Sequence, residues 1–201
     1  MALTSRKKRP LDRCIPHLRD TRLVIIAAEG QETEKQYFAV FRDTRVQVKI
    51  LPTGADNRSS PQDVINRLHL FRDEYQIGDN DELWLMVDVD RWPKLSEIAG
   101  EACQCQYFLA ISNPCFEVWL LCHFQEPPHD ATYCSPVEDA LRATLGGSYN
   151  KSSLNIPQFY GRINDAITRA KELDHYSGDR WPQTVGSHVY RVVQSILGLN
   201  R

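Results

Sequence analysis

Short apolar runs recur along the first two thirds of the chain and alternate with segments of helical periodicity. Residues 23–28 and 82–87 are almost entirely apolar, which is typical of strands buried on both faces of a parallel sheet. In residues 46–51 valine and isoleucine occupy every second position, as in a strand with one apolar face. Residues 107–111 form a fourth short run. We therefore expect four strands.

Between these strands, apolar residues repeat at the spacing of one helix face. The expected helices are residues 33–43, 61–77, 94–103 and 114–123. Pro61 and Pro114 suit the first turn of their helices, where a missing N–H costs nothing. Strands that alternate with helices predict right-handed βαβ units, and hence an α/β fold with a mostly parallel, doubly wound sheet.

From residue 135 the pattern predicts helices only, at 135–145, 157–174 and 184–197. So short a segment rarely builds a core of its own, and we expect it to form an α-helical cap on the α/β core. The chain then divides into a basic N-terminal arm (1–22), an α/β core (23–134) and the C-terminal cap (135–201).

Composition agrees with a folded protein. The 201 residues are 42% hydrophobic and 25% charged, which excludes wholesale disorder, collagen and coiled coil. No run approaches the roughly 20 apolar residues of a membrane helix, and no apolar segment follows the basic start as in a secretion signal. We expect a soluble, cytoplasmic protein with no membrane contact.

Six cysteines should stay reduced in that compartment. Their spacing contains no C-x2-C pair of the kind found in zinc ribbons, so we expect buried free thiols. The alternative is a mixed site formed by Cys115, Cys122 and His123.

The net charge of −2 hides an asymmetry between the arm and the rest of the chain. Residues 1–22 hold seven Lys or Arg against two Asp, a balance of +5, so the remainder carries −7. A basic arm suits contacts with phosphates, and Arg6, Lys7, Lys8 and Arg9 are the candidates. The alternative is a solvated terminal segment without a ligand.

Polar residues follow three of the expected strands. Glu29 and Gly30 follow the first, Asp88 and Asp90 the third, and Ser112 the fourth. Ligands of open α/β sheets bind at these carboxyl ends, and a divalent cation offsets the repulsion of clustered carboxylates. Glu29, Asp88 and Asp90 are therefore a candidate Mg²⁺ or Mn²⁺ site. The alternative is that each acid caps a helix or belongs to a turn.

Four segments together resemble the RloB-like family of Toprim-like proteins encoded beside type I restriction systems. They are residues 28–38 (AEGQETEKQYF), 88–91 (DVDR), 112–124 (SNPCFEVWLLCHF) and 147–151 (GSYNK). The resemblance implies a Toprim-like, metal-dependent nuclease of phage defence, commonly working beside an ABC-type ATPase. It also implies that Glu29 acts as a general acid/base or metal ligand, and that Asp88 and Asp90 bind Mg²⁺.

Further polar residues near these motifs have two interpretations each. Glu117 binds the metal or supports its ligands. Lys151 offsets charge on the scissile phosphate, or is a solvated loop lysine. Arg91 contacts a phosphate, or pairs with one of the neighbouring aspartates.

Three more residues lie beside the same motifs. Glu34 is a first-turn acid that complements the helix dipole, or it supports the site. Asn113 binds a ligand or caps a helix, and His123 is better explained as a helix cap than as a base.

Two functions remain. The first is a metal-dependent nuclease that cleaves RNA or DNA. The second is a non-catalytic Toprim-like subunit that binds an ABC-type ATPase or a nucleotide signal. Three clustered acids favour the first, although the acidic body lacks a basic groove unless a partner supplies it. The sequence carries no signal that separates RNA from DNA or that sets the oligomeric state.

Overall fold

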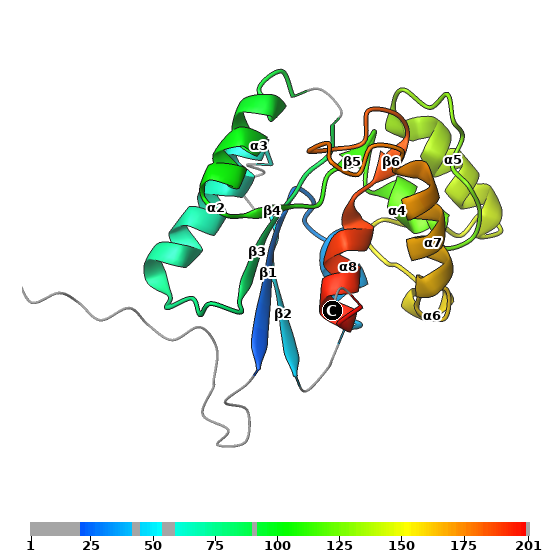
Figure 1. The fold of residues 1–201 in the computed structure, drawn as a ribbon. Coiled ribbons are helices and arrows are strands. Elements are labelled where there is room, and N and C mark those ends of the chain that lie inside the picture. The colour runs from blue at the N-terminus through cyan, green and yellow to red at the C-terminus, as the bar shows by residue number, and fades with distance from the viewer. Residues whose placement is uncertain (1–20, 42–44, 54–58, 90–91, 200–201) are drawn as a thin grey trace, which may run out of the picture.

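A four-stranded sheet forms the centre of the protein (Figure 1). The computed structural model describes residues 21–41, 45–53, 59–89 and 92–199. The strands are β1 (Arg22–Ala28), β2 (Val46–Leu51), β3 (Glu82–Met86) and β4 (Phe108–Leu109). They are all parallel and lie in the order β2-β1-β3-β4. The prediction of a parallel α/β sheet is confirmed, and all four expected strands are present.

Helices cover both faces of this sheet, as expected for a doubly wound fold. On one face lie α2 (Pro61–Glu74) and α3 (Leu95–Gln104). The other face carries α1, α4, α7 and α8, with α5 and α6 further out (Figure 1). The bounds of these helices are Thr33–Phe38 (α1), Glu117–Cys122 (α4), Cys134–Thr144 (α5), Ile156–Tyr160 (α6), Ile163–Leu173 (α7) and Val189–Leu197 (α8).

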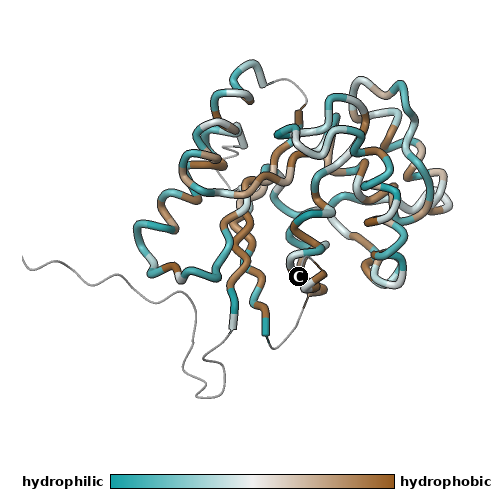
Figure 2. Tube along the Cα trace, in the orientation of Figure 1, coloured by the Kyte–Doolittle hydropathy of each residue, from teal (hydrophilic) through white to brown (hydrophobic). Residues whose placement is uncertain are grey.

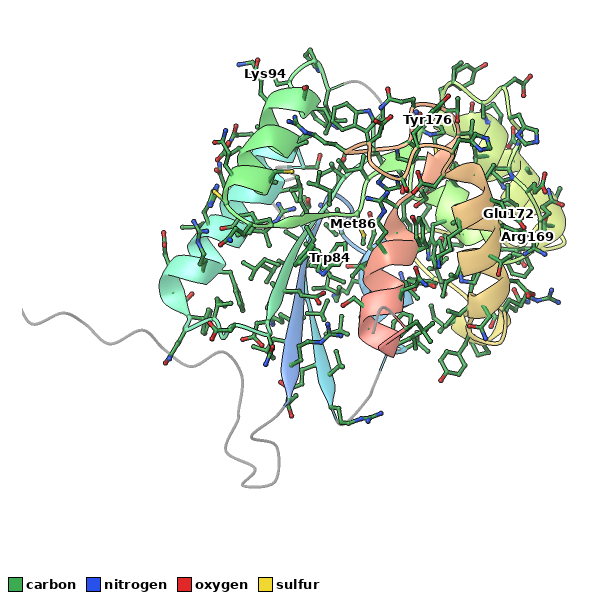
Figure 3. All side chains as sticks on the ribbon, viewed as in Figure 1. Trp84, Met86, Lys94, Arg169, Glu172 and Tyr176 are labelled. Carbon is green, nitrogen blue, oxygen red and sulfur yellow. A yellow bond between two sulfur atoms is a disulfide. The ribbon has the colours of Figure 1, made fainter. Side chains whose placement is uncertain are left out.

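The two cores follow from the alternation of side chains along each strand. In β1, Leu23 and Ile25 pack toward α2 and α3, whereas Val24 and Ile26 pack toward the opposite helices. The central strands accordingly form a continuous hydrophobic band in Figure 2. The second core is the one between the sheet and helices α1, α4, α7 and α8. Trp84 and Met86 of β3 belong to it and point from the sheet toward these helices (Figure 3).

That second core also contains Val137, Ala166 and Val192, so it runs across the predicted boundary between residues 134 and 135. The C-terminal helices therefore share their core with the sheet. The division into arm, core and cap stays a prediction.

Local signals explain several helix ends. The side chain of Ser60 accepts a hydrogen bond from the Asp63 backbone N–H, and Pro61 occupies the first position of α2, as expected. Helix α8 ends at Gly198, whose φ of 69° is the left-handed conformation that glycine adopts without strain.

Several predicted elements need correction. Helix α4 begins at Glu117 rather than at Pro114, and α1 ends at Phe38. The single helix predicted over 157–174 is two helices, α6 and α7, because the chain breaks at Gly161 and Arg162. Helix α2 ends at Glu74 and β4 is shorter than expected.

The start of the helix predicted over 184–197 is a strand. Gly186–Ser187 forms β6, which pairs antiparallel with β5 (Ser112–Asn113). The Ser112 and Ser187 hydroxyls lie 2.8 Å apart and join the two strands. Strands of two residues are too short to produce an alternating pattern, so the sequence carried no sign of them.

The prediction that all cysteines are buried free thiols is wrong. Cys115 and Cys134 form a disulfide with their Cα atoms 5.6 Å apart. Of the other described cysteines, Cys122 is buried, Cys105 is half-buried and Cys103 is exposed. Cys14 lies outside the described residues. Cys115 and Cys134 are 19 residues apart in sequence, and only the packing of α4 against α5 brings them together.

Within the described ranges, no helix has the length and apolar character needed to cross a membrane.

Candidate functional site

A cavity of about 400 Å³ opens at the carboxyl ends of β1 and β3; we call it the crevice. Strand order reverses between these two strands, and such switch points are where doubly wound sheets bind their ligands. The described residues that line the crevice include the acids Glu29, Glu32, Glu34, Asp88 and Glu117 and the amine of Lys151. Of the predicted site residues, Asp90, Arg91, Arg6, Lys7, Lys8 and Arg9 lie outside the described residues.

Glu29 and Asp88 lie side by side at the ends of neighbouring strands. The backbone N–H of Glu29 donates to the Met86 carbonyl at 3.1 Å, which extends the β1–β3 pairing by one residue. The backbone N–H of Asp88 in turn donates to Glu29 Oε2 at 3.2 Å. Both side chains are half-buried. The pairing of the strands therefore brings these two predicted acids together.

Two residues missed by sequence reasoning hold the turn after β1. Thr53 donates from Oγ1 to the Glu29 carbonyl at 2.6 Å, and its N–H donates to the Gly30 carbonyl at 3.3 Å. Arg67 of α2 donates from Nη2 to the Ala28 carbonyl at 2.6 Å. Because both bind backbone carbonyls, no motif in the sequence marks them.

Glu34 packs its carboxyl group onto Gly30. The Gly30 N–H donates to Glu34 Oε1 at 3.1 Å, and a Cβ added at residue 30 would lie 2.0 Å from Glu34 Oε2. Only glycine allows this approach. Burial raises the pKa of Glu34 to about 7, and the negative charges of Glu117 and Glu29 add to the effect. The structure thus brings Glu34 into the crevice rather than leaving it as an exposed first-turn acid.

Glu117 is the buried first residue of α4 and binds two donors through one oxygen. Its Oε1 accepts from the Tyr149 hydroxyl at 2.9 Å and lies 2.9 Å from Lys151 Nζ. Lys151 also pairs with Glu138 Oε1 at 2.8 Å. Partial burial lowers the pKa of Lys151, but the attraction of Glu117 and Glu138 outweighs it and the net shift is upward. Lys151 therefore carries a full positive charge beside the acids.

The loop that carries Lys151 is fastened to α1. The Lys151 carbonyl accepts from Thr33 Oγ1 at 3.1 Å and from Gln36 Nε2 at 3.2 Å, and the Leu154 N–H donates to Gln36 Oε1 at 2.9 Å. Since α1 directly follows the turn after β1, these bonds place residue 151 at the strand ends.

Two other candidates lie away from the crevice. Asn113 donates from Nδ2 to the Pro182 carbonyl at 2.9 Å, so it neither caps α4 nor lines the cavity. His123 is buried; its Nδ1 donates to the Trp119 carbonyl at 3.0 Å, and its Nε2 accepts from the Tyr37 hydroxyl at 3.1 Å. Burial lowers the pKa of His123 to about 4, so the ring is neutral and caps α4, as expected.

The alternative metal site of Cys115, Cys122 and His123 is not formed. Cys115 is bonded to Cys134, and both nitrogens of His123 have hydrogen-bond partners.

The fold and the crevice define a class: a doubly wound α/β protein with clustered carboxylates and a lysine at the switch point of its sheet. The model of one family, described as RloB-like protein, matches residues 24–196. The chain therefore belongs to the RloB-like family. No curated protein and no solved structure matches it.

Proposed function

We propose that the chain is a Toprim-like, metal-dependent nuclease that hydrolyses phosphodiester bonds in RNA or DNA. The observation that carries the proposal is the convergence of Glu29 and Asp88 at the β1/β3 switch point, with Lys151 lining the same cavity. Carboxylates facing one cavity repel one another, and a bound cation is a common way to balance them.

The donor set fits a hard divalent cation. Every acid that lines the crevice offers carboxylate oxygens, the ligands that Mg²⁺ and Mn²⁺ prefer. Glu29 and Asp88, together with Asp90 two residues further along the sequence, are the proposed ligands. When bound, the cation would supply charge to the entering and leaving oxygens of the phosphodiester.

The chain's own residues contribute positioning and proton transfer. The Lys151 ammonium pairs with Glu117 and Glu138. Its proposed role is to stabilise the negative charge that develops on the phosphate oxygens during cleavage. Glu34 has a pKa near neutrality, which suits a carboxyl group that exchanges a proton with a nearby water. Tyr149 keeps Glu117 oriented through its hydrogen bond to Oε1.

The biological setting is proposed from the family. The resemblance implies a role in phage defence beside an ABC-type ATPase, and such a partner would supply basic surface that the acidic crevice lacks. Arg6, Lys7, Lys8, Arg9 and Arg91 remain the proposed phosphate contacts.

A cleavage assay tests the proposal. The purified chain, alone and with the neighbouring ATPase, is incubated with tRNA and plasmid in Mg²⁺ or Mn²⁺. Glu29→Gln and Asp88→Asn should abolish cleavage, and Lys151→Ala should lower its rate about 100-fold, or about 2.7 kcal/mol. Lys151→Arg should restore only part of the cleavage rate, because a planar guanidinium does not replace a compact ammonium.

The control is Asp139→Asn, an exposed acid on α5 outside the crevice, which should cleave like the wild type. Calorimetry adds a second readout: Asp88→Ala should no longer bind Mn²⁺, while its melting temperature without metal stays equal or rises as repulsion is relieved. Full cleavage by Asp88→Asn, or in a chelator, would overturn the proposal.

A further inference from the structure

Behind the crevice, Cys115, Glu117 and Cys134 bring three metal-ligating atoms together. The two sulfurs and a carboxylate oxygen all lie within 4.8 Å of one another. Cys115 and Glu117 are buried, whereas Cys134 is half-buried and so reachable from solvent. Glu117 and Cys134 are the first residues of α4 and α5, and Cys115 lies two residues before α4, so the packing of the two helices fixes the spacing of all three.

The two carboxylate oxygens of Glu117 have different neighbours. Oε1 faces the crevice and binds Tyr149 and Lys151. Oε2 lies 3.2 Å from Cys134 Sγ. A disulfide sulfur carries no proton, so while the bond to Cys115 exists this contact is not a hydrogen bond to the buried carboxylate. The surroundings of Oε2 thus favour a state in which the sulfur is a thiol, or in which a cation lies between sulfur and oxygen.

We propose that reduction of the Cys115–Cys134 disulfide creates a Zn²⁺ site from both thiolates and Glu117 Oε2, with solvent in the fourth position. A dithiol reductant supplies two electrons; the S–S bond breaks, each sulfur gains a proton, and the reductant becomes a disulfide. Binding of Zn²⁺ then displaces the two thiol protons to solvent.

The geometry and the ligand types both support zinc. Around a tetrahedral ion with Zn–S distances of about 2.3 Å, the sulfurs lie about 3.8 Å apart. Cα atoms 5.6 Å apart allow that separation by side-chain rotation. Thiolates select zinc over magnesium, so this site and the all-carboxylate crevice would take different ions although Glu117 borders both.

Co²⁺ is the spectroscopic probe, because thiolate-bound Co²⁺ absorbs visibly and Zn²⁺ does not. Protein reduced with a phosphine and then desalted should bind a single equivalent of Co²⁺, with a thiolate charge-transfer band and tetrahedral bands. A single equivalent of Zn²⁺ should remove these bands, and a large excess of Mg²⁺ should leave them. Protein that keeps the disulfide should show none.

Variants assign the ligands. Cys115→Ser and Cys134→Ser should each lose the Co²⁺ bands of the wild type, and Glu117→Gln should keep a thiolate band but bind roughly 10–100-fold more weakly. The matched control, C14S/C103S/C105S, should bind like the wild type. Circular dichroism of each variant checks that it is folded.

The proposal is overturned if the reduced wild type shows no charge-transfer band, or if folded Cys134→Ser shows the same band. These readouts do not involve cleavage, so the zinc site and the nuclease proposal fail independently.

Discussion

The carboxyl group of Glu34 lies against the backbone of Gly30, which has no side chain. Gly30 leaves the space, and burial together with two neighbouring acids raises the pKa of the group to about 7. A carboxyl group in this position is neutral in half of the molecules near neutral pH. Its ionisation is therefore coupled to folding.

The sign of that coupling is set by the raised pKa. The ordinary value is 4.5, so the contribution of Glu34 to stability is fully present below about pH 4.5 and is lost as pH rises through 7, by up to about 3 kcal/mol. Glu34→Gln removes the ionisation. In a chelator, its melting temperature should exceed that of the wild type by several degrees at about pH 8, and the difference should largely vanish by about pH 5. Glu97→Gln, an exposed acid on α3 outside the crevice, is the control, and an equal shift of Glu34→Gln at both pH values would contradict the assignment.

Residue by residue, sequence reasoning found the acids but not their supports. Glu29 and Asp88 were visible because they follow apolar strands directly. Thr53 and Arg67 were invisible because each binds a carbonyl, and carbonyls have no sequence identity. For Glu34 the sequence could not decide between an acid that complements the helix dipole and one that supports the site, because helical spacing does not show whether a first-turn side chain points to solvent or to the strand ends.

Among the elements, the junction of α7 and α8 depends on one buried carboxylate. Asp174, directly after α7, accepts from the Tyr190 hydroxyl at 2.7 Å and from Arg191 Nη2 at 2.9 Å, and lies 3.3 Å from His188 Nε2. Its side chain is 4% exposed. Burial raises the pKa of Asp174, but the hydrogen bonds from Tyr190 and Arg191 outweigh it and lower the net value.

Replacing this carboxylate should loosen both helices. Asp174→Asn puts an amide against two donors and leaves the Arg191 charge without its partner, which should cost roughly 2–4 kcal/mol in urea unfolding. Because the pKa is lowered, the difference from the wild type should begin to shrink only below the ordinary value of 3.8, and should be lost as pH falls through the lowered pKa of the folded state. Asp165→Asn, exposed on α7, is the control; a loss equal to that of Asp165→Asn would argue against the junction's importance.

Element boundaries show where periodicity stops being informative. Phe159 and Ile163 are four residues apart, so the apolar repeat continues through the break between α6 and α7. Only Gly161, a weak helix former, marks the break. The long strands were predictable because a strand that is buried on both faces must consist almost entirely of apolar residues. In contrast, β5 and β6 exist because two segments far apart in sequence pair with each other.

On the scale of the whole molecule, charge is divided between the arm and the body. The arm carries +5 and the rest of the chain −7, yet the described charged residues that line the crevice, which we assign to phosphate chemistry, are five acids and one lysine. Phosphate binding would then depend on the bound cation, on Lys151 and on the arm. Residues 1–20 lie outside the described part of the chain, so the arm's role stays a prediction.

Salt dependence tests the arm. Deleting residues 5–9 removes four positive charges, and the slope of log affinity for nucleic acid against log salt should fall by about three units. The control variant K94A/K171A removes two exposed lysines of the body (Lys94 is labelled in Figure 3) and should leave the slope unchanged. An unchanged slope after the deletion would remove the arm from the binding surface.

The crevice also has a consequence for the order of events during translation. The residues that line it run from 29 to 152 in sequence, and the loop of Lys151 is held by α1, more than a hundred positions earlier. A nascent chain on the ribosome thus has both strands that end at the crevice long before it has the lysine. A chain truncated between residues 117 and 151 would keep the acids but lack their counter-charge, so the proposed nuclease activity would be withheld until about three quarters of these 201 residues had been made.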